Sequence, residues 1–556
     1  MDLAAFRAAQ ARTNQQLLDE SGVSQAVADV AVSSSKPSST GSAKAPTKKK
    51  ATTKKRKAEV EADDAPVTRR RSTRTATVVA SVQDKEEQER LRLKAAEEEE
   101  ARLAKEKEEM NRRKHGDRTI KAGGGVTDAG DEETLLTTLK EIAELSIDEP
   151  EEKWEKGKKP KADTRKLESE SRDMGLRAIV KTIPDRIYSL AIHPSTDRDL
   201  VFAGDKTGHL SLWDCTDAGK DLPSVTNGSI RNGAGGADGD EDGAEEVETK
   251  QWGKWWVWQG HLQNSVSCLK FRPGDSKSIY SASYDGTLRV HDFEKGVSSE
   301  VIDGDRWTDE ALLHSFDFDA TGNEIWVSDN NGGLIFRDLR EPKESAKRWD
   351  IDGYKVGCVS LNPANPSMAA TSHLKRYMRL WDLSVLRSLP EDTPLSDILE
   401  GDNSPLLAYH SHEKAVSSAY FDPSGTRLAS TSYDDAIRIW DIDPKKTSGY
   451  AEDQKWKPAS LTAHNCQVGR YVTVLRAHWS PSPQLPPHLF IGDMIRGVNL
   501  YSADGTRVKV FQDDSITAVP AVTAAHPVRG GFYAGGSASG KISLLTYPRD
   551  GEGDEE

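Results

Sequence analysis

Residues 411–442 read SHEKAVSSAYFDPSGTRLASTSYDDAIRIWDI, and this stretch predicts three short strands separated by two turns. Strand-forming residues fill 415–421, 428–432 and 437–440. Asp422-Pro-Ser-Gly425 between the first two strands is typical of a tight turn, because proline fixes φ and glycine tolerates a positive φ. One such unit leaves its strand edges and one face uncovered, so it is not stable alone.

The unit recurs along the chain, and this repetition predicts the fold. Comparable segments begin near residues 186, 265, 312, 356, 472 and 516, of which the last two are degenerate. Asp292, Asp338 and Asp382, each at the end of a third strand, are 46 and 44 residues apart, near the length of a four-stranded blade. We therefore predict an all-β fold, a seven-bladed β-propeller over residues 176–548.

The last unit ends near Pro548 after only three strands, which leaves one edge of its sheet open. Residues 176–183, LRAIVKTI, precede the first unit and have strand character. We predict that they supply the outer strand of the seventh blade and close the ring, because closure removes an exposed strand edge.

Two patterns within the repeats carry a family resemblance. Some third strands end in Trp-Asp, and two units have an Asp in the second turn with a His ahead of the first strand. The residues are Trp213, Trp381, Trp440, Asp285, Asp434, His261 and His412. They resemble the WD-repeat family, which implies that Asp, His, a strand Ser or Thr and Trp form a hydrogen-bonded set that locks a blade. Only the second and fifth units carry both Asp and His, so we expect packing to hold the others.

Composition divides the rest of the chain. Residues 1–82 are rich in Ser, Thr, Ala, Pro and Lys, which is typical of disorder. Glu, Lys, Arg, Ala and Leu dominate 83–115 without a heptad and favour a solvated single helix. The expected organisation is a disordered basic tail at 1–82, a charged helix at 83–115, a linker with a short helix at 116–175, the propeller at 176–548 with an acidic insertion at 215–250, and an acidic tail at 549–556.

The formal net charge of −14 is unevenly spread. Residues 1–82 hold 15 Lys and Arg against 8 Asp and Glu, a balance of +7, which leaves −21 on the remainder. The tail contains basic runs that indicate nuclear import or nucleic-acid binding, the alternative being a solubilising tail. The import candidates are Lys48, Lys49, Lys50, Lys54, Lys55, Arg56 and Lys57, and they predict a nuclear protein.

No catalytic or metal-binding pattern stands out. GxSxG, HExxH and Walker motifs are absent, so we predict neither an enzyme nor a resident cofactor or metal. Cys215, Cys268, Cys358 and Cys466 form no CxxC pair and are expected to be reduced packing residues of an intracellular protein. No apolar run of about 20 residues indicates a membrane span. The Trp-rich stretch 252–258 is interpreted as an outer strand packed between blades rather than as an aromatic binding cage.

In a propeller blade, the loop that leads into the first strand and the turn between the second and third strands lie at one end of the ring. Sorting by this rule gathers basic and aromatic side chains at that end. The candidates for DNA contact are Arg186, Lys206, Lys355, Lys375, Arg376, Tyr377, Arg470 and Arg496. Cations would neutralise phosphates and flat rings would stack on exposed bases. The alternative is that several of many loops are basic by chance.

Three blocks sharpen the resemblance: GLRAIVKTIPDRIYSLAIHPSTDRDLVFAGDKTGHLSLWD at 175–214, NCQVGRYVTVLRAHWSP at 465–481 and FIGDMIRGVNLYSADG at 490–505. They resemble the fungal DNA damage-binding WD-repeat family across the propeller but not across the N-terminal tail. The resemblance implies a nuclear protein of DNA metabolism that binds single- and double-stranded DNA and prefers ultraviolet-damaged DNA. It implies no residue-level site, so the DNA-contact candidates rest on the loop argument.

An alternative function comes from the end of the third blade, where Phe-Arg-Asp-Leu-Arg spans 336–340. Its Asp-x-Arg resembles the box by which WD-repeat substrate receptors dock on the cullin-4 ubiquitin-ligase adaptor. Asp338 and Arg340 would then form the docking site, at the end opposite the basic loops, although Arg337 stands where the box has Trp. The expected partners are therefore damaged duplex and single-stranded DNA, chromatin-associated proteins and a ligase adaptor, with no membrane.

Overall fold

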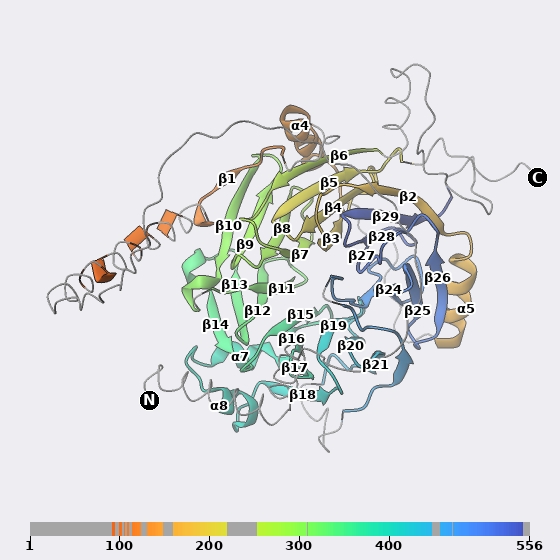
Figure 1. Ribbon diagram of the computed structural model, residues 1–556. Helices are drawn as coiled ribbons and strands as arrows, with labels where there is room; N and C mark the ends of the chain where they lie inside the picture. The colour runs from red at the N-terminus through yellow and green to blue at the C-terminus, as the bar shows by residue number, and fades with distance from the viewer. Residues whose placement is uncertain are drawn as a thin grey trace, which may run out of the picture. The chain divides into compact units, whose positions relative to one another are not determined.

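The computed structural model describes residues 114–123, 131–147, 160–218, 253–308, 310–446, 456–469 and 471–548, with scattered positions between 90 and 109. The positions described between 90 and 109 are helical and exposed. Seven antiparallel sheets stand around a common axis, which confirms the predicted seven-bladed β-propeller (Figure 1). No helix among these residues is long and apolar enough to cross a membrane.

Each blade has four strands numbered outward from the ring axis. The first holds β3 (Ile187–Ile192), β4 (Leu200–Asp205), β5 (His209–Asp214) and β6 (Lys254–Gln259). The second holds β7 (Val266–Phe271), β8 (Ser278–Ser283), β9 (Thr287–Asp292) and β10 (Val297–Asp303). The third holds β11 (Leu313–Phe318), β12 (Glu324–Asp329), β13 (Gly333–Asp338) and β14 (Lys347–Asp350). The fourth holds β15 (Val356–Asn362), β16 (Asn365–His373), β17 (Tyr377–Asp382) and β18 (Leu406–Ser411).

The fifth blade holds β19 (Val416–Phe421), β20 (Arg427–Ser432), β21 (Ala436–Asp441) and β22 (Ser460–Ala463). The sixth holds β23 (His478–Trp479), β24 (His488–Asp493), β25 (Gly497–Ser502) and β26 (Arg507–Gln512). The seventh holds β27 (Val522–Ala525), β28 (Tyr533–Gly536), β29 (Lys541–Thr546) and β2 (Gly175–Lys181). Short helices interrupt the connections: α7 (Leu383–Ser388), α8 (Leu395–Glu400), η1 (Gly304–Arg306) and η2 (Lys343–Ser345).

The predicted ring closure is confirmed. β2 pairs antiparallel with β29, with Ile179 opposite Ser543 and Lys181 opposite Lys541. The outermost strand of the last blade therefore comes from the segment ahead of the first blade, and the pairing ties the two ends of the domain together. Ala178 and Val180 of β2 are buried against the first-blade core, which adds apolar packing to the hydrogen bonds.

Both faces of each sheet are buried between neighbouring blades, so the strands read as nearly continuous apolar or small runs. β6 shows this best: Trp255, Trp256 and Trp258 are all buried, on alternate faces of the strand. This confirms the interpretation of that stretch as a packed outer strand; Trp252 lies outside the described residues. All four cysteines are free thiols, three of them buried and Cys268 half-buried.

Buried polar pairs differ from the expected WD pattern. In the second blade His261 bonds Asp285 at 3.0 Å and Ser281 at 2.7 Å, as the family resemblance implies. In the fifth blade His412 bonds Ser430 at 2.9 Å, but Asp434 instead pairs with Arg438 at 2.9 Å. The positive charge of the arginine competes better for the carboxylate than a neutral imidazole does.

The expectation that the other blades hold by packing alone was wrong. The third blade buries an ion pair between Asp329 and Arg348 at 2.7 Å. The fourth places Asp352 2.9 Å from His373 and 2.6 Å from Arg379, so the acid and the imidazole have exchanged their usual positions. These pairs tie the turn of each blade to its strands, as the WD set does in the second blade.

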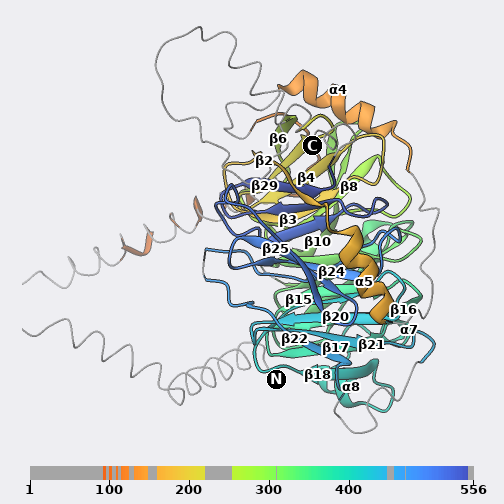
Figure 2. The same cartoon turned by 90° about the vertical axis from the view of Figure 1, so that its right-hand side faces the viewer.

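The segment between the charged helix and the first blade holds more structure than the one helix expected there. β1 (Arg118–Thr119) adds a fifth strand to the second blade. The helix expected at 132–145 is α4 (Glu132–Ala143), which buries its apolar face on β6 and the second blade. A further helix, α5 (Pro160–Glu170), lies along β25 and β26, with Leu167 fully buried (Figure 2).

Candidate nucleic-acid interface

The ring has two distinct ends. We call the end at which the innermost strands begin the proximal end, and the opposite end the distal end. Backbone bonds show that the second turns lie at the proximal end: Lys206 N donates to Arg186 O at 2.9 Å, and Leu374 N donates to Lys355 O at 3.1 Å. The end assignment made from strand order is therefore the one that the fold displays.

Three of the candidate cations come from the loops of the first and fourth blades. Lys206 is exposed at the tip of its turn, while Arg186 beside it is half-buried, its guanidinium 5.8 Å from the Tyr188 ring centroid. Lys355 is half-buried on the axis side of the fourth blade. Burial and the nearby Arg476 lower the Lys355 pKa to about 8, because both disfavour the charged ammonium.

The second turn of the fourth blade presents a compact basic and aromatic group. Lys375 is exposed, and its Nζ lies 3.6 Å from the Tyr354 ring centroid. Arg376 is exposed and holds a left-handed backbone with φ of 70°, a conformation usually left to glycine or asparagine. Tyr377 begins β17 half-buried, with its ring edge-on to Tyr409 at 6.0 Å. The turn thus holds two cations outward, with part of a tyrosine ring open beside them.

The sixth blade repeats the arrangement. Ile495 and Arg496 form its second turn, both exposed, and Arg496 again has a left-handed backbone, with φ of 68°. Of the eight candidates, Arg470 lies outside the described residues; the other seven all lie at the proximal end. The structure brings them to one surface without testing what they bind.

Sequence reasoning missed two residues of the segment that leads into the sixth blade. This segment does not pair as a strand until β23; instead Thr473 Oγ1 donates to Ile187 O of the first blade at 2.8 Å. Tyr471 on it is 75% exposed, and Arg476 points toward groups of the second, fourth and fifth blades. The available signal was the block at 465–481, whose residues depart from the repeat pattern.

At the distal end, Asp338 and Arg340 lie where the docking interpretation needs them. Arg340 has an exposed side chain but folds back on its own Asp338, Nη2 to Oδ2 at 2.5 Å and Nε to Oδ1 at 2.9 Å. This pairing lowers the Asp338 pKa to about 2. Arg337 turns inward instead and donates to Val301 O, so it offers no aromatic surface at the position of the box Trp.

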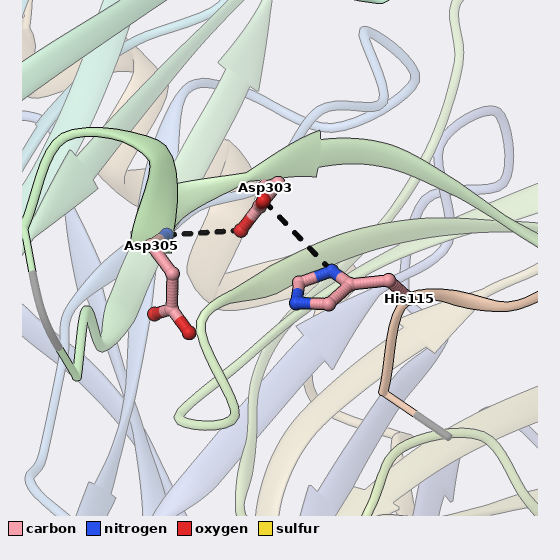
Figure 3. A group of neighbouring side chains, drawn as sticks. All are labelled: His115, Asp303 and Asp305. Atoms are coloured by element: carbon pink, nitrogen blue, oxygen red, sulfur yellow. Dashed lines mark hydrogen bonds and ion pairs between the residues drawn. The ribbon is translucent and has the colours of Figure 1, made fainter. Parts of the chain in front are cut away.

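Three potential metal ligands meet beside β10 (Figure 3). Side-chain ligand atoms of His115, Asp303 and Asp305 lie within 4.8 Å of one another. Each already has a protein partner: His115 Nδ1 is 2.6 Å from Glu300, Asp305 is 2.5 Å from Lys114 Nζ, and Asp303 accepts from Asp305 N at 3.0 Å. The group is satisfied without an ion, and we interpret it as the anchor of the N-terminal segment on the second blade.

A polar pocket of about 620 Å³ lies between the fifth and sixth blades. Its lining includes Asp435 and Asp493, together with His464, Asn499 and Arg507. Two carboxylates on one wall oppose an anionic ligand, so this pocket is not where phosphates would be bound.

The ring of seven sheets, the locking set of the second blade and the loops gathered at one end define a WD-repeat propeller, a class of binding platform. The WD domain, G-beta repeat family matches residues 254–292 and 403–441, the stretches that contain His261 and His412. Among curated proteins, the chain is 32% identical to the DNA damage-binding protein CMR1 of Cryptococcus neoformans (strain JEC21), over 69% of this chain and 71% of that protein.

Two further relatives bear the same name. That of Mycosarcoma maydis is 30% identical over 74% of this chain and 78% of its own length. That of Neurospora crassa is 33% identical over 66% of this chain and 65% of its own length. The chain therefore belongs to the family of DNA damage-binding proteins named CMR1.

Proposed function

We propose that this protein binds DNA through the proximal end of its propeller, takes both single and double strands, and prefers ultraviolet-damaged DNA. The family names support a DNA damage-related binding role. The observation that carries the proposal is the set of cations at the proximal end, most of them held outward on turns of the first, fourth and sixth blades. A non-enzymatic role fits a fold that supplies a platform of loops.

Electrostatics explains how an acidic protein would bind a polyanion. The net charge of −14 repels DNA at long range, but repulsion between exposed charges is screened beyond about 10 Å at 0.1 M salt. Within that distance Lys206, Lys375, Arg376 and Arg496 would meet phosphates directly and release counterions. Rings such as Tyr377 and Tyr471 would stack on bases that damage has unpaired.

The test is a binding titration of the full-length protein by fluorescence anisotropy. Intact duplex, the same duplex after ultraviolet irradiation, and one of its strands are compared at salt concentrations from about 50 to 200 mM. We expect affinity that falls steeply with salt on all three, and tighter binding to the irradiated duplex. Equal affinity for irradiated and intact duplex would contradict the damage preference, and salt-independent binding would contradict the phosphate contacts.

Nuclear localisation is part of the proposal, since a protein of DNA damage acts where the DNA is. The import candidates lie outside the described residues. Replacing Lys48–Lys50 and Lys54–Lys57 by Ala should move a fluorescent fusion toward the cytoplasm. Unchanged nuclear fluorescence would mean that this basic run is only a solubilising tail.

Docking on a ligase adaptor remains a second proposal, favoured by the exposed Arg340 at the distal end, where it leaves the DNA surface free. Docking would have to break the Arg340–Asp338 pair, which is exposed and therefore costs about 1 kcal/mol or less to separate. The proposal predicts that Arg340→Ala abolishes co-purification of the adaptor and leaves DNA affinity unchanged. Adaptor recovery equal to that of the wild type would refute it.

A further inference from the structure

Side chains from five blades converge at the proximal mouth of the central channel. We call them the channel-mouth cluster: Tyr188, Tyr284, Lys355, Tyr420, Tyr433 and Arg476. Arg476, from the sixth blade, is electrostatically coupled to Tyr284 of the second, Cys358 of the fourth and Tyr420 of the fifth. A side chain that reaches groups of opposite blades must lie near the ring axis. All six residues are half-buried, as expected in a solvent-filled channel.

The cluster holds two cations and no carboxylate partner for them. Among the residues that the structure describes, neither the Arg476 guanidinium nor the Lys355 ammonium has a hydrogen bond or ion pair to an acidic group. The groups coupled to Arg476 are phenols and thiols, which are neutral near pH 7; the Tyr284 pKa is raised to about 12 by burial. The nearest internal pair, Lys270 with Asp317 at 2.6 Å, is already neutral as a unit.

Two uncompensated cations side by side are costly, because they repel each other and each loses part of its hydration. Both remain at an opening that faces the exposed basic loops. Buried charges in proteins are normally paired, so the arrangement indicates a partner that the chain itself does not supply. That partner must be an anion small enough to reach a half-buried guanidinium.

Aromatic rings surround the same opening. Tyr188 and Tyr284 pack edge to face at 6.2 Å, and Tyr284 OH is 3.1 Å from His314 Nδ1, which fixes that ring in place. Tyr420 stacks on His478 at 4.7 Å deeper in the channel. Above them, the segment that carries the exposed Tyr471 is tied to the first blade through Thr473. A flat, uncharged group attached to the anion would therefore meet ring surfaces on its way in.

We propose that the channel-mouth cluster binds one unpaired nucleotide of a DNA strand, with its phosphate held by Arg476 and Lys355. This inference rests on the proposed DNA binding and names the part of the DNA that the centre of the surface takes. The phosphates of a regular duplex lie on its outside and stay with the exposed loops. Only a nucleotide that has left the stack brings a phosphate into the channel, and unstacking is least costly at damaged or mismatched sites.

The acidic segments of this chain are poor competitors for the cluster. The strand ahead of the insertion, β5, and the strand ahead of the C-terminal tail, β29, are both third strands and run toward the distal end. The acidic residues therefore begin on the opposite side of the ring, whereas the loops that would deliver DNA surround the mouth itself.

The test compares two DNA substrates on the full-length protein. One is an intact duplex and the other is the same duplex with a run of unpaired thymidines on one strand, each titrated by fluorescence anisotropy. Arg476→Gln should weaken binding of the second roughly 10- to 100-fold and of the first less than about twofold, the range for loss of a charged hydrogen bond. Lys355→Gln should act in the same direction. Lys277→Gln at the distal end, matched in charge change, should alter neither.

A second readout does not depend on DNA affinity. Thymidine monophosphate or inorganic phosphate should raise the melting temperature of the wild type, because a ligand of the folded state stabilises it, and should do so less for Arg476→Gln. If the wild type bound no DNA but still responded to thymidine monophosphate, the proposed function would fail and the site would stand. Equal loss on both DNA substrates, or stabilisation by a poly-glutamate peptide but not by phosphate, would overturn the inference. Arg476→Lys, which keeps the charge, should retain most of the binding if the variant effects are electrostatic.

Discussion

Lys355 is the residue at which the account makes its sharpest chemical prediction. Its pKa of about 8 means that it is charged at pH 7 and largely neutral at pH 9. The groups that face it do not titrate in this range: Arg476 stays protonated, and burial holds the His314 pKa well below its usual value. Binding to DNA with unpaired thymidines should therefore weaken between pH 7 and 9, and Lys355→Arg should flatten that dependence.

The check is the pH profile of affinity for the wild type and Lys355→Arg, with the intact duplex as reference. An arginine stays charged throughout, so only the wild type should change. Parallel profiles for the two proteins would show that another group titrates, and that Lys355 does not contact the DNA.

Residue-level inference from sequence was uneven. Lys206, Lys375, Arg376 and Arg496 could be placed because strand order fixes which turns share an end of the ring. Arg476 could not, since its segment abandons the strand pattern, and only the folded ring brings it near groups of opposite blades. The exchange of Asp434 from His412 to Arg438 was equally invisible, because both partners are close to it and their competition depends on geometry.

At the scale of elements, the pairing of β2 with β29 predicts how the domain fails. Deleting residues 176–183 should leave the seventh blade with an open edge and remove the buried Ala178 and Val180. Exposed edges pair with other chains, so the variant should melt at a lower temperature and aggregate. Size-exclusion chromatography and thermal melting measure both effects. A monomeric deletion variant with wild-type melting would contradict the role of β2 in closure.

The helix α4 offers a second test at this scale. Leu139 is fully buried in the cluster that joins α4 to Trp258, whereas Lys140 beside it is exposed. Leu139→Ala should lower the free energy of unfolding by about 2–5 kcal/mol, the usual cost of emptying a buried leucine site. Lys140→Ala is the matched control and should change it by about 0.5 kcal/mol or less. Equal, small effects in denaturant titrations would mean that α4 does not belong to the folded domain.

Elements were predicted well where repetition constrained them and poorly elsewhere. Seven similar units could be aligned with one another, so even the strand at 176–183 was found from the gap it had to fill. β1 and α5 have no such internal standard. α5 has a polar sequence, PKADTRKLESE, and is held through few apolar contacts, chiefly Leu167.

For the molecule as a whole, buried histidines predict a loss of stability in acid. Burial lowers the pKa to about 4 for His193, His373 and His488, and to about 3 for His412 and His478. The unfolded chain takes up protons near pH 6.5 and the folded protein does not. Stability is therefore full above about pH 6.5 and falls as the pH drops toward 4, by up to about 1.4 kcal/mol per pH unit for each histidine.

Melting temperatures measured from pH 8 to 4.5 check this expectation. His488→Gln, which removes one such group, should reduce the steepness of the decline by about one proton. A melting temperature that stays constant down to pH 4.5 would show that these histidines are protonated in the folded protein as well.

The most direct test of the central claim, that the proximal end binds DNA, is the salt dependence of a quadruple variant. Changing Lys375, Arg376, Arg470 and Arg496 to Ala should weaken binding and reduce the slope of log affinity against log salt by about 0.9 for each lost phosphate contact. The control removes the same charge from distal turns, with Lys277, Lys295, Arg340 and Lys343 changed to Ala, and should keep the wild-type slope. If the proximal variant kept wild-type affinity and slope, or if both variants lost them equally, the DNA surface would lie elsewhere.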